Sequence, residues 1–152
     1  MIWKPHVTVA AVIERENRFL FVEEETTRGL AFNQPAGHLE EGEDLIAAVK
    51  REVIEETAWQ FEPENLVAVQ LWRRSPEQPS FLRICFAGRC HSYNPELQLD
   101  EGIVATHWLT REQIAEQQER LRSILVLKSV DHYLNGERYP LSMIKSLIDY
   151  GS

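Results

Sequence analysis

Three glutamates, Glu52, Glu55 and Glu56, are the side chains of this sequence best suited to chemistry. At about 100° per residue, helix positions i, i+3 and i+4 share one face, so these carboxylates lie together if the segment is helical. Like charges so placed repel one another, and a bound cation removes the repulsion. Because carboxylate oxygens are hard ligands, the spacing predicts a site for Mg²⁺, with Mn²⁺ as an alternative. A solvated acidic face that binds no ion is the other interpretation of this short pattern.

The neighbouring residues predict the helix that positions these carboxylates. It runs from about residue 44 to residue 57 and begins at Asp44, a residue type favoured as an N-cap. Beside the acidic face runs an apolar stripe that can anchor the helix to a sheet: Ile46, Val49 and Val53. Arg51 precedes Glu55 by one helical turn and is also near Glu43. We therefore expect Arg51 to orient carboxylates rather than to bind substrate.

The segment before the helix, residues 35–43, contains two glycines and is expected to form a tight loop. A loop that leads into a helix N-terminus offers backbone N–H groups to phosphate and carbonyl oxygens to a metal ion. This loop is therefore a candidate for contacts to both a phosphate group and a metal ion.

The rest of the chain alternates between strand and helix patterns. Four segments rich in β-branched and aromatic residues predict strands, the first two as a hairpin: residues 7–13, 19–22, 66–72 and 81–90. Residues 23–29 are polar and are expected to form a loop. A second helix is expected after Thr110, where Gln113 completes a capping box, and a third over residues 124–134. Residues 1–152 are therefore predicted to form a single mixed α/β domain, a helix–sheet–helix sandwich.

Composition and charge narrow the class of protein. Hydrophobic residues make up 43% and charged residues 26%, as is usual for a globular chain. The net charge of −8 argues against binding to a nucleic-acid polymer, but not against a phosphorylated small molecule held through a metal ion. No apolar run is long enough for a bilayer, and residues 1–6 do not resemble a signal peptide, so a cytoplasmic protein is expected. Cys85 and Cys90 point to opposite faces of a predicted strand, so no disulfide is expected between them.

The acidic helix and the loop before it resemble the Nudix box, G-x5-E-x7-R-E-U-x-E-E-x-G-U, in which U is a bulky apolar residue. The matching positions are Gly37, Glu43, Arg51, Glu52, Val53, Glu55, Glu56 and Trp59. Ala58 stands where the family has a glycine, which we expect to end the helix in a left-handed conformation. We expect alanine at this position to affect the stability of the fold more than the binding of a metal ion.

The resemblance implies a Nudix fold, an α/β/α sandwich with a mixed β-sheet, and Mg²⁺-dependent attack of water on a phosphorus atom. It also implies the metal ligands: Glu52, Glu55, Glu56 and the carbonyl oxygen of Ala36. One of the carboxylates is expected to act as the base, with Arg51 as the orienting member of the catalytic group. Asp100 and Glu101 lie in a loop where many Nudix enzymes place a further acidic residue, and Glu101 is the candidate considered for it.

Segments outside the box resemble the phosphatase J branch of the bacterial Nudix enzymes, notably residues 33–40, 81–83, 121–123 and 138–141. This implies a phosphatase that releases orthophosphate from nucleoside tri- and diphosphates, with thiamine-precursor pyrophosphates as further candidates. The side chains expected to contact substrate are Gln34, Arg83, Trp72 and Phe81. One alternative is a Nudix pyrophosphohydrolase that acts on nucleotide sugars or dinucleoside polyphosphates, or that converts nucleoside triphosphates to monophosphates and pyrophosphate. The other is a noncatalytic Nudix module that senses a nucleotide. The sequence does not fix the oligomeric state.

Overall fold

The structure is a computed structural model that describes residues 1–148, with eight strands and three α-helices in that part of the chain. The strands are β1 (His6–Arg15), β2 (Arg18–Thr26), β3 (Gly29–Asn33), β4 (Ala36–His38), β5 (Gln60–Arg73), β6 (Ser80–His91), β7 (Ile103–Leu109) and β8 (Tyr139–Pro140). The helices are α1 (Leu45–Thr57), α2 (Arg111–Glu116) and α3 (Leu125–Leu134), with 3₁₀ turns η1 (Gln118–Arg120) and η2 (Leu141–Met143). No helix among residues 1–148 is long and apolar enough to cross a membrane.

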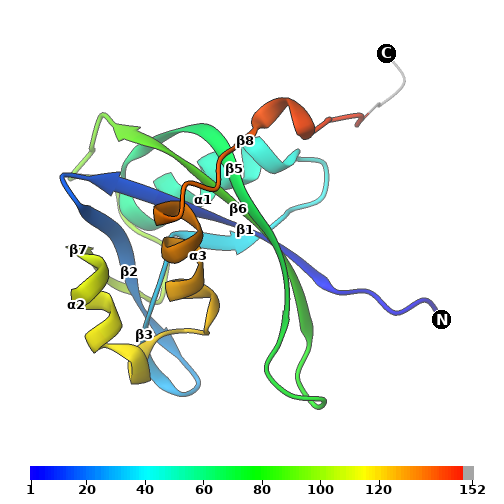
Figure 1. Ribbon diagram of the computed structural model, residues 1–152, viewed down its shortest axis with the longest axis horizontal. Helices are drawn as coiled ribbons and strands as arrows, with labels where there is room; N and C mark the ends of the chain where they lie inside the picture. The colour runs from blue at the N-terminus through cyan, green and yellow to red at the C-terminus, as the bar shows by residue number, and fades with distance from the viewer. Residues whose placement is uncertain (149–152) are drawn as a thin grey trace.

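The sheet is mixed, as expected. Its main path is β3-β2-β1-β6-β5-β8, with β4 paired to β1 and β7 paired to β2. The β1–β6 pair is parallel, and the other strand pairs are antiparallel. In Figure 1 the β5–β6 hairpin and the β2–β3 hairpin extend toward the same end of the molecule. The sheet therefore brings β4, β6 and the tips of two hairpins around one region.

Strand β1 is buried on both faces, which makes it the centre of an α/β/α sandwich. Its residues alternate between two core layers, with Val9, Ala11 and Ile13 in one and Ala10 and Val12 in the other. Helix α1 supplies the first layer with Ala48, Val49 and Val53, and helices α2 and α3 supply the second with Ile114, Val126 and Val130. The helix–sheet–helix arrangement predicted from the sequence is confirmed.

The caps of the helices also agree with the sequence. Asp44 is the N-cap of α1 and accepts a hydrogen bond from the backbone N–H of Ala47 at 2.7 Å. Thr110 and Gln113 form the predicted capping box of α2. Ala58 ends α1 with φ 65° and ψ 13°, the left-handed conformation expected at the position of the family's glycine. The left-handed conformation is sterically unfavourable for alanine, whose Cβ glycine lacks.

The polar segment 23–29 is not the loop that the sequence predicted. Strand β2 continues to Thr26, and β3 begins at Gly29. Acidic side chains are accommodated in β2 because polar partners lie beside them: Glu23 hydrogen-bonds to His107 at 3.0 Å and also pairs with Arg120. The short β4 and the seven-residue β7 were likewise not predicted, since their pairing partners lie far away in sequence.

The two cysteines are free and buried, as expected. Cys85 packs in the layer that contacts α3, whereas Cys90 packs in the layer that contacts α1. Their side chains thus lie on opposite faces of β6, which explains why they form no disulfide.

Candidate active site

Three carboxylates meet at the acidic face of α1. One oxygen from each of Glu52, Glu55 and Asp100 lies within 4.8 Å of the others. Carboxylates this close repel strongly unless a cation lies between them, and three hard oxygen donors suit Mg²⁺ or Mn²⁺. The donor set therefore fits the divalent ion expected from the sequence.

Asp100 reaches this cluster because its loop is bonded to the end of α1. The backbone N–H of Asp100 donates to the carbonyl oxygen of Glu55 at 2.9 Å, and that of Asn94 donates to the carbonyl oxygen of Ala58 at 2.9 Å. The sequence drew attention to this loop but favoured Glu101, which is exposed and is not a member of the cluster. The bond to Glu55 and the turn from Asp100 to Ile103, closed by a 3.1 Å hydrogen bond, bring the Asp100 carboxylate to the cluster, although Asp100 is itself exposed.

Gly37 leaves the space that the Glu52 carboxylate occupies. A Cβ atom built at residue 37 would lie 2.2 Å from the carboxylate carbon of Glu52. Gly37 is the middle residue of β4 and pairs with Val9 of β1, so its backbone has little freedom to retreat. The first glycine of the motif thus leaves the room in which the Glu52 carboxylate approaches β4.

Arg51 donates hydrogen bonds to the acidic side chains around it. Its guanidinium donates to Glu43 at 2.7 Å, to Glu52 at 2.8 Å and to Glu55 at 3.1 Å. It also donates to the backbone carbonyl of His38 at 3.0 Å, which ties the helix to the end of β4. These contacts raise the pKa of Arg51, with the bond to Glu43 contributing most, and the same bond lowers the pKa of Glu43. The arginine therefore stays charged and partly offsets the repulsion among the carboxylates.

Glu56 lies deeper than the other two helix glutamates. It is 7% exposed, and its Oε1 accepts a hydrogen bond from the backbone N–H of Ala36 at 2.9 Å. Burial raises the pKa of Glu56 to about 9, and burial raises that of Glu52 to about 7 in spite of Arg51. Glu56 is not a member of the Glu52–Glu55–Asp100 cluster, but it joins α1 to β4 directly beside it. In the absence of a cation, Glu56 favours the protonated form at neutral pH, whereas Glu52, with a pKa of about 7, is divided between the protonated and ionised forms.

A cavity of about 520 Å³ begins at β4 and runs toward the tips of the two hairpins. Ala36 and Gly37 line its inner end, which places that end next to the acidic face. Trp72 and Phe81 also line it, with ring centroids 6.0 Å apart and planes inclined by 34°. Two half-buried rings on one wall offer an apolar surface for a flat organic group.

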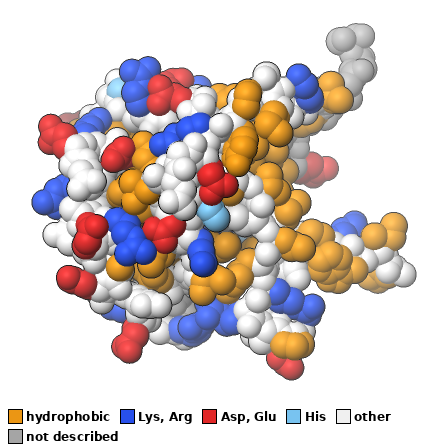
Figure 2. Space-filling view, in the orientation of Figure 1, with side chains coloured by type: hydrophobic (Ala, Val, Ile, Leu, Met, Phe, Trp, Pro, Cys, Tyr) orange, Lys and Arg blue, Asp and Glu red, His pale blue; other side chains and the backbone are white. Residues whose placement is uncertain are grey.

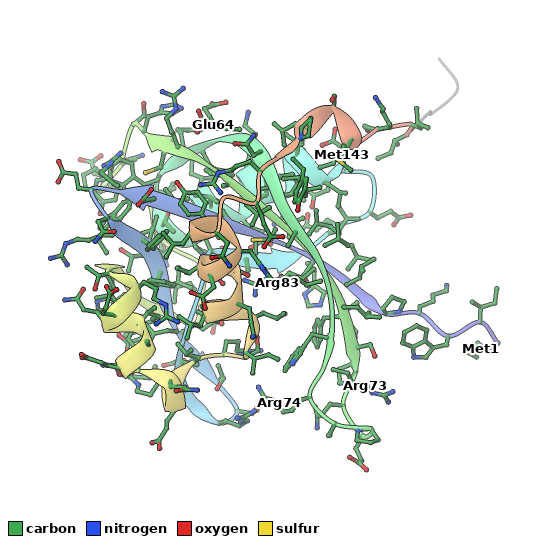
Figure 3. All side chains as sticks on the ribbon, viewed as in Figure 1. Met1, Glu64, Arg73, Arg74, Arg83 and Met143 are labelled. Carbon is green, nitrogen blue, oxygen red and sulfur yellow. The ribbon has the colours of Figure 1, made fainter. Side chains whose placement is uncertain are left out.

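Arg83 is the buried cation of this cavity. It is 4% exposed, lines the cavity, and donates to the side-chain oxygens of Gln34 at 2.7 Å and Asn33 at 3.3 Å. Among residues 1–148 it has no carboxylate within 4 Å, and burial lowers its pKa. Figure 3 shows Arg83 close to α3, where Gln34 also bonds to the backbone of Val126 at 2.6 Å. A buried guanidinium with only neutral acceptors retains capacity for an anion.

The predicted substrate-contact residues thus fall into two groups. Arg83, Trp72 and Phe81 line the cavity, whereas Gln34 is 1% exposed and is not among the lining residues. Gln34 contacts Arg83 and α3 instead, so its observed contacts are those of a residue that orients the guanidinium.

Comparison with known proteins gives a consistent result. The NUDIX domain family model matches residues 4–128. The chain is 41% identical over 143 residues to the phosphatase NudJ of Escherichia coli strain K12, which covers 94% of this chain and 92% of that protein. A solved NUDIX hydrolase from Nitrosomonas europaea superposes with a TM-score of 0.92 at 41% identity, covering 98% of this chain and all of that one. The MutT protein from Methanosarcina mazei shares the fold, with a TM-score of 0.71 at 22% identity over 91% of this chain and 100% of that one.

Proposed function

The chain belongs to the Nudix family, and from this we propose that it is a divalent-metal-dependent phosphatase for small organic phosphoanhydrides. The substrates proposed are nucleoside tri- and diphosphates, with thiamine-precursor pyrophosphates as further candidates, and the product released is orthophosphate. The observation that carries the proposal is the Glu52–Glu55–Asp100 cluster beside a cavity that contains a buried arginine. Identity of 41% over most of both chains to a protein named phosphatase NudJ supports phosphatase activity.

In this proposal the carboxylates of Glu52, Glu55 and Asp100 hold Mg²⁺ or Mn²⁺, and Glu56 and the carbonyl of Ala36 complete the site. The ion, when bound, lowers the pKa of a water molecule and neutralises phosphate oxygens. Arg51 keeps the glutamates oriented through its three carboxylate contacts. A carboxylate that is ionised in the loaded site accepts the proton of the attacking water.

The cavity positions the rest of the substrate. Arg83 is proposed to bind a phosphate oxygen, because its charge is buried and has only amide oxygens as partners. Trp72 and Phe81 are proposed to contact the organic group, and Gln34 acts through Arg83. The distance between the wall of aromatic rings and the acidic cluster decides which phosphorus atom the water attacks.

The test is product analysis with a nucleoside triphosphate. Time-resolved ³¹P NMR, run without added pyrophosphatase, should show orthophosphate and diphosphate first, and monophosphate later. Pyrophosphate that appears first and in equal amount to monophosphate would assign the chain to the pyrophosphohydrolases of the family. Turnover that continues undiminished in excess chelator would refute the role of the metal ion. Absence of turnover with every phosphoanhydride tested would favour a noncatalytic nucleotide-sensing module.

A further inference from the structure

Three arginines from distant parts of the chain gather at the outer end of the cavity, and we call them the arginine rim: Arg28, Arg74 and Arg122. Arg28 lies in the turn between β2 and β3, Arg74 follows β5 directly, and Arg122 lies between η1 and α3. All three line the cavity of about 520 Å³, and Arg28 and Arg74 also line a neighbouring cavity of about 580 Å³. Figure 3 shows Arg74 reaching from the β5–β6 hairpin into the space between the two hairpins. Figure 2 shows Lys and Arg side chains on this part of the surface.

The rim holds like charges close together. Arg74 donates to the backbone carbonyl of Arg122 at 2.7 Å, and its guanidinium lies 5.1 Å from the centre of the Trp72 ring. Partial desolvation, and then the charges of Arg28 and Arg122, lower the pKa of Arg74. Within residues 1–148 the ion pair of a rim arginine is that of Arg122 with Glu24, at 3.7 Å. An anion placed among these guanidinium groups would relieve their repulsion.

The wall of the cavity as a whole favours anions. Five arginines line it, whereas the acidic residues that line it are Glu24 and Glu119. One of the five arginines, Arg120, is already neutralised by Glu23. This excess of positive charge occurs in a chain whose net charge is −8, so it is a local feature and not a reflection of composition.

The strand register gives the distance between the rim and the inner end of the cavity. Gln70 pairs with Arg83, so Arg74 lies four residues further along the β5–β6 hairpin than Arg83, or about 13 Å. Arg28 precedes Asn33 by five residues along β3, or about 17 Å. A ligand that contacts both ends must therefore be an extended molecule with an anionic group at each end.

We propose that the arginine rim binds a second anionic group, a phosphate, carried by the substrate on the end away from the anhydride that is cleaved. This rests on the proposed function, because it assumes that the anhydride lies beside β4 and the acidic cluster. It narrows the substrate class to phosphoanhydrides whose organic part bears a further phosphate. The exposed guanidinium groups of the rim then select substrates without taking part in the chemistry.

Binding of molecules that lack an anhydride tests the rim separately from catalysis. Isothermal titration calorimetry on the full chain with Mg²⁺ compares octyl monophosphate, inorganic phosphate and 1,8-octanediol bisphosphate, an anhydride-free molecule whose two phosphates can lie as far apart as the rim and the inner end of the cavity. The variant is the double substitution Arg28→Gln with Arg122→Gln, which removes charge but keeps side-chain length. The matched control is Arg89→Gln, which removes an exposed arginine paired with Glu64 and outside the cavity. Thermal melting of each variant verifies that it folds.

We expect the bisphosphate to bind at least about tenfold more tightly than the monophosphate to the wild type and to Arg89→Gln, and within about twofold in the double variant. Equal binding of the monophosphate and the bisphosphate by the wild type, or a preference that survives in the double variant, would overturn the proposal. Inorganic phosphate could also bind as tightly as the bisphosphate, and only when the rim is intact. That result would mean that the rim binds free phosphate rather than the substrate, and it would overturn the proposal. A normal preference in binding, with no hydrolysis of any phosphoanhydride tested, would refute the proposed function and leave the rim assignment standing.

Discussion

Replacing Glu56 with glutamine should change how the stability of the ion-free protein depends on pH. In the fold, burial raises the pKa of this carboxyl from 4.5 to about 9. A group whose pKa is raised on folding contributes stability below its unfolded pKa and loses that contribution as pH rises toward its folded pKa. The wild type in chelator should therefore become less stable between about pH 4.5 and about pH 9. Glutamine cannot ionise, so the variant lacks this part of the pH dependence.

The size of the effect follows from the same linkage. One pKa unit corresponds to about 1.4 kcal/mol, so the slope gives up to about 2.7 kcal/mol between about pH 5.5 and about pH 7.5. Water penetration and relaxation of the site reduce this figure, and we expect at least about 1 kcal/mol. In a domain of this size that loss lowers Tm by about 2–4 °C. Mg²⁺ should restore Tm in the wild type at the upper pH, because an ion stabilises ionised carboxylates.

The assay is thermal unfolding in chelator, followed by circular dichroism across this pH range, for the wild type and Glu56→Gln. Glu41→Gln is the control, since Glu41 is exposed in the loop before α1. The control should follow the wild type, while the Tm of Glu56→Gln should equal or exceed that of the wild type at the upper pH. With Mg²⁺, Glu56→Gln should also lose at least about tenfold in kcat. Parallel Tm curves for Glu56→Gln and the wild type would refute the reasoning about burial.

Three further substitutions test the site and its support. Asp100→Asn should lower kcat at least about tenfold in a steady-state assay, whereas Glu101→Gln should keep most of the activity. The reverse order would mean that Glu101, and not Asp100, is the metal ligand. Gly37→Ala should raise the Mg²⁺ concentration needed for half-maximal rate, because its Cβ displaces the Glu52 carboxylate; an unchanged metal titration would contradict that contact. Ala58→Gly should keep activity and raise Tm by up to about 4 °C, through relief of left-handed strain worth about 1 kcal/mol; a lower Tm would count against strain at this residue.

Local interactions account for the parts of the fold that the sequence predicts well. Asp44 and Ala58 mark the two ends of α1, and each does so through contacts within a few residues. Val49 and Val53 reach the core as their helical spacing indicates. The acidic face depends on the same short-range geometry, which explains why Arg51 bonds to the glutamates one residue and one turn away.

Contacts between segments far apart in the sequence account for the features of the fold and the site that the sequence did not predict. Residues 23–29 seemed too polar for strands, because the partners of Glu23, His107 and Arg120, lie far away in the sequence. Asp100 joins the cluster through a backbone bond to a helix 45 residues earlier in the chain, and no local pattern distinguishes it from Glu101. The burial of Gln34 likewise depends on α3, whose Val126 carbonyl accepts its amide.

The loop that carries Asp100 is joined to the C-terminal end of α1 by two main-chain hydrogen bonds. The N–H groups of Asn94 and Asp100 donate to the carbonyl oxygens of Ala58 and Glu55, so we expect the loop to keep its place whether or not a cation is bound. Binding and release of a cation should then involve only side chains and water. Because the backbone is already ordered, binding should carry no cost in backbone conformational entropy. In amide hydrogen exchange, the N–H of Asp100 should be as protected in chelator as in Mg²⁺. A cation held by Glu52, Glu55 and Asp100, as proposed, would then be able to leave and return without movement of the backbone.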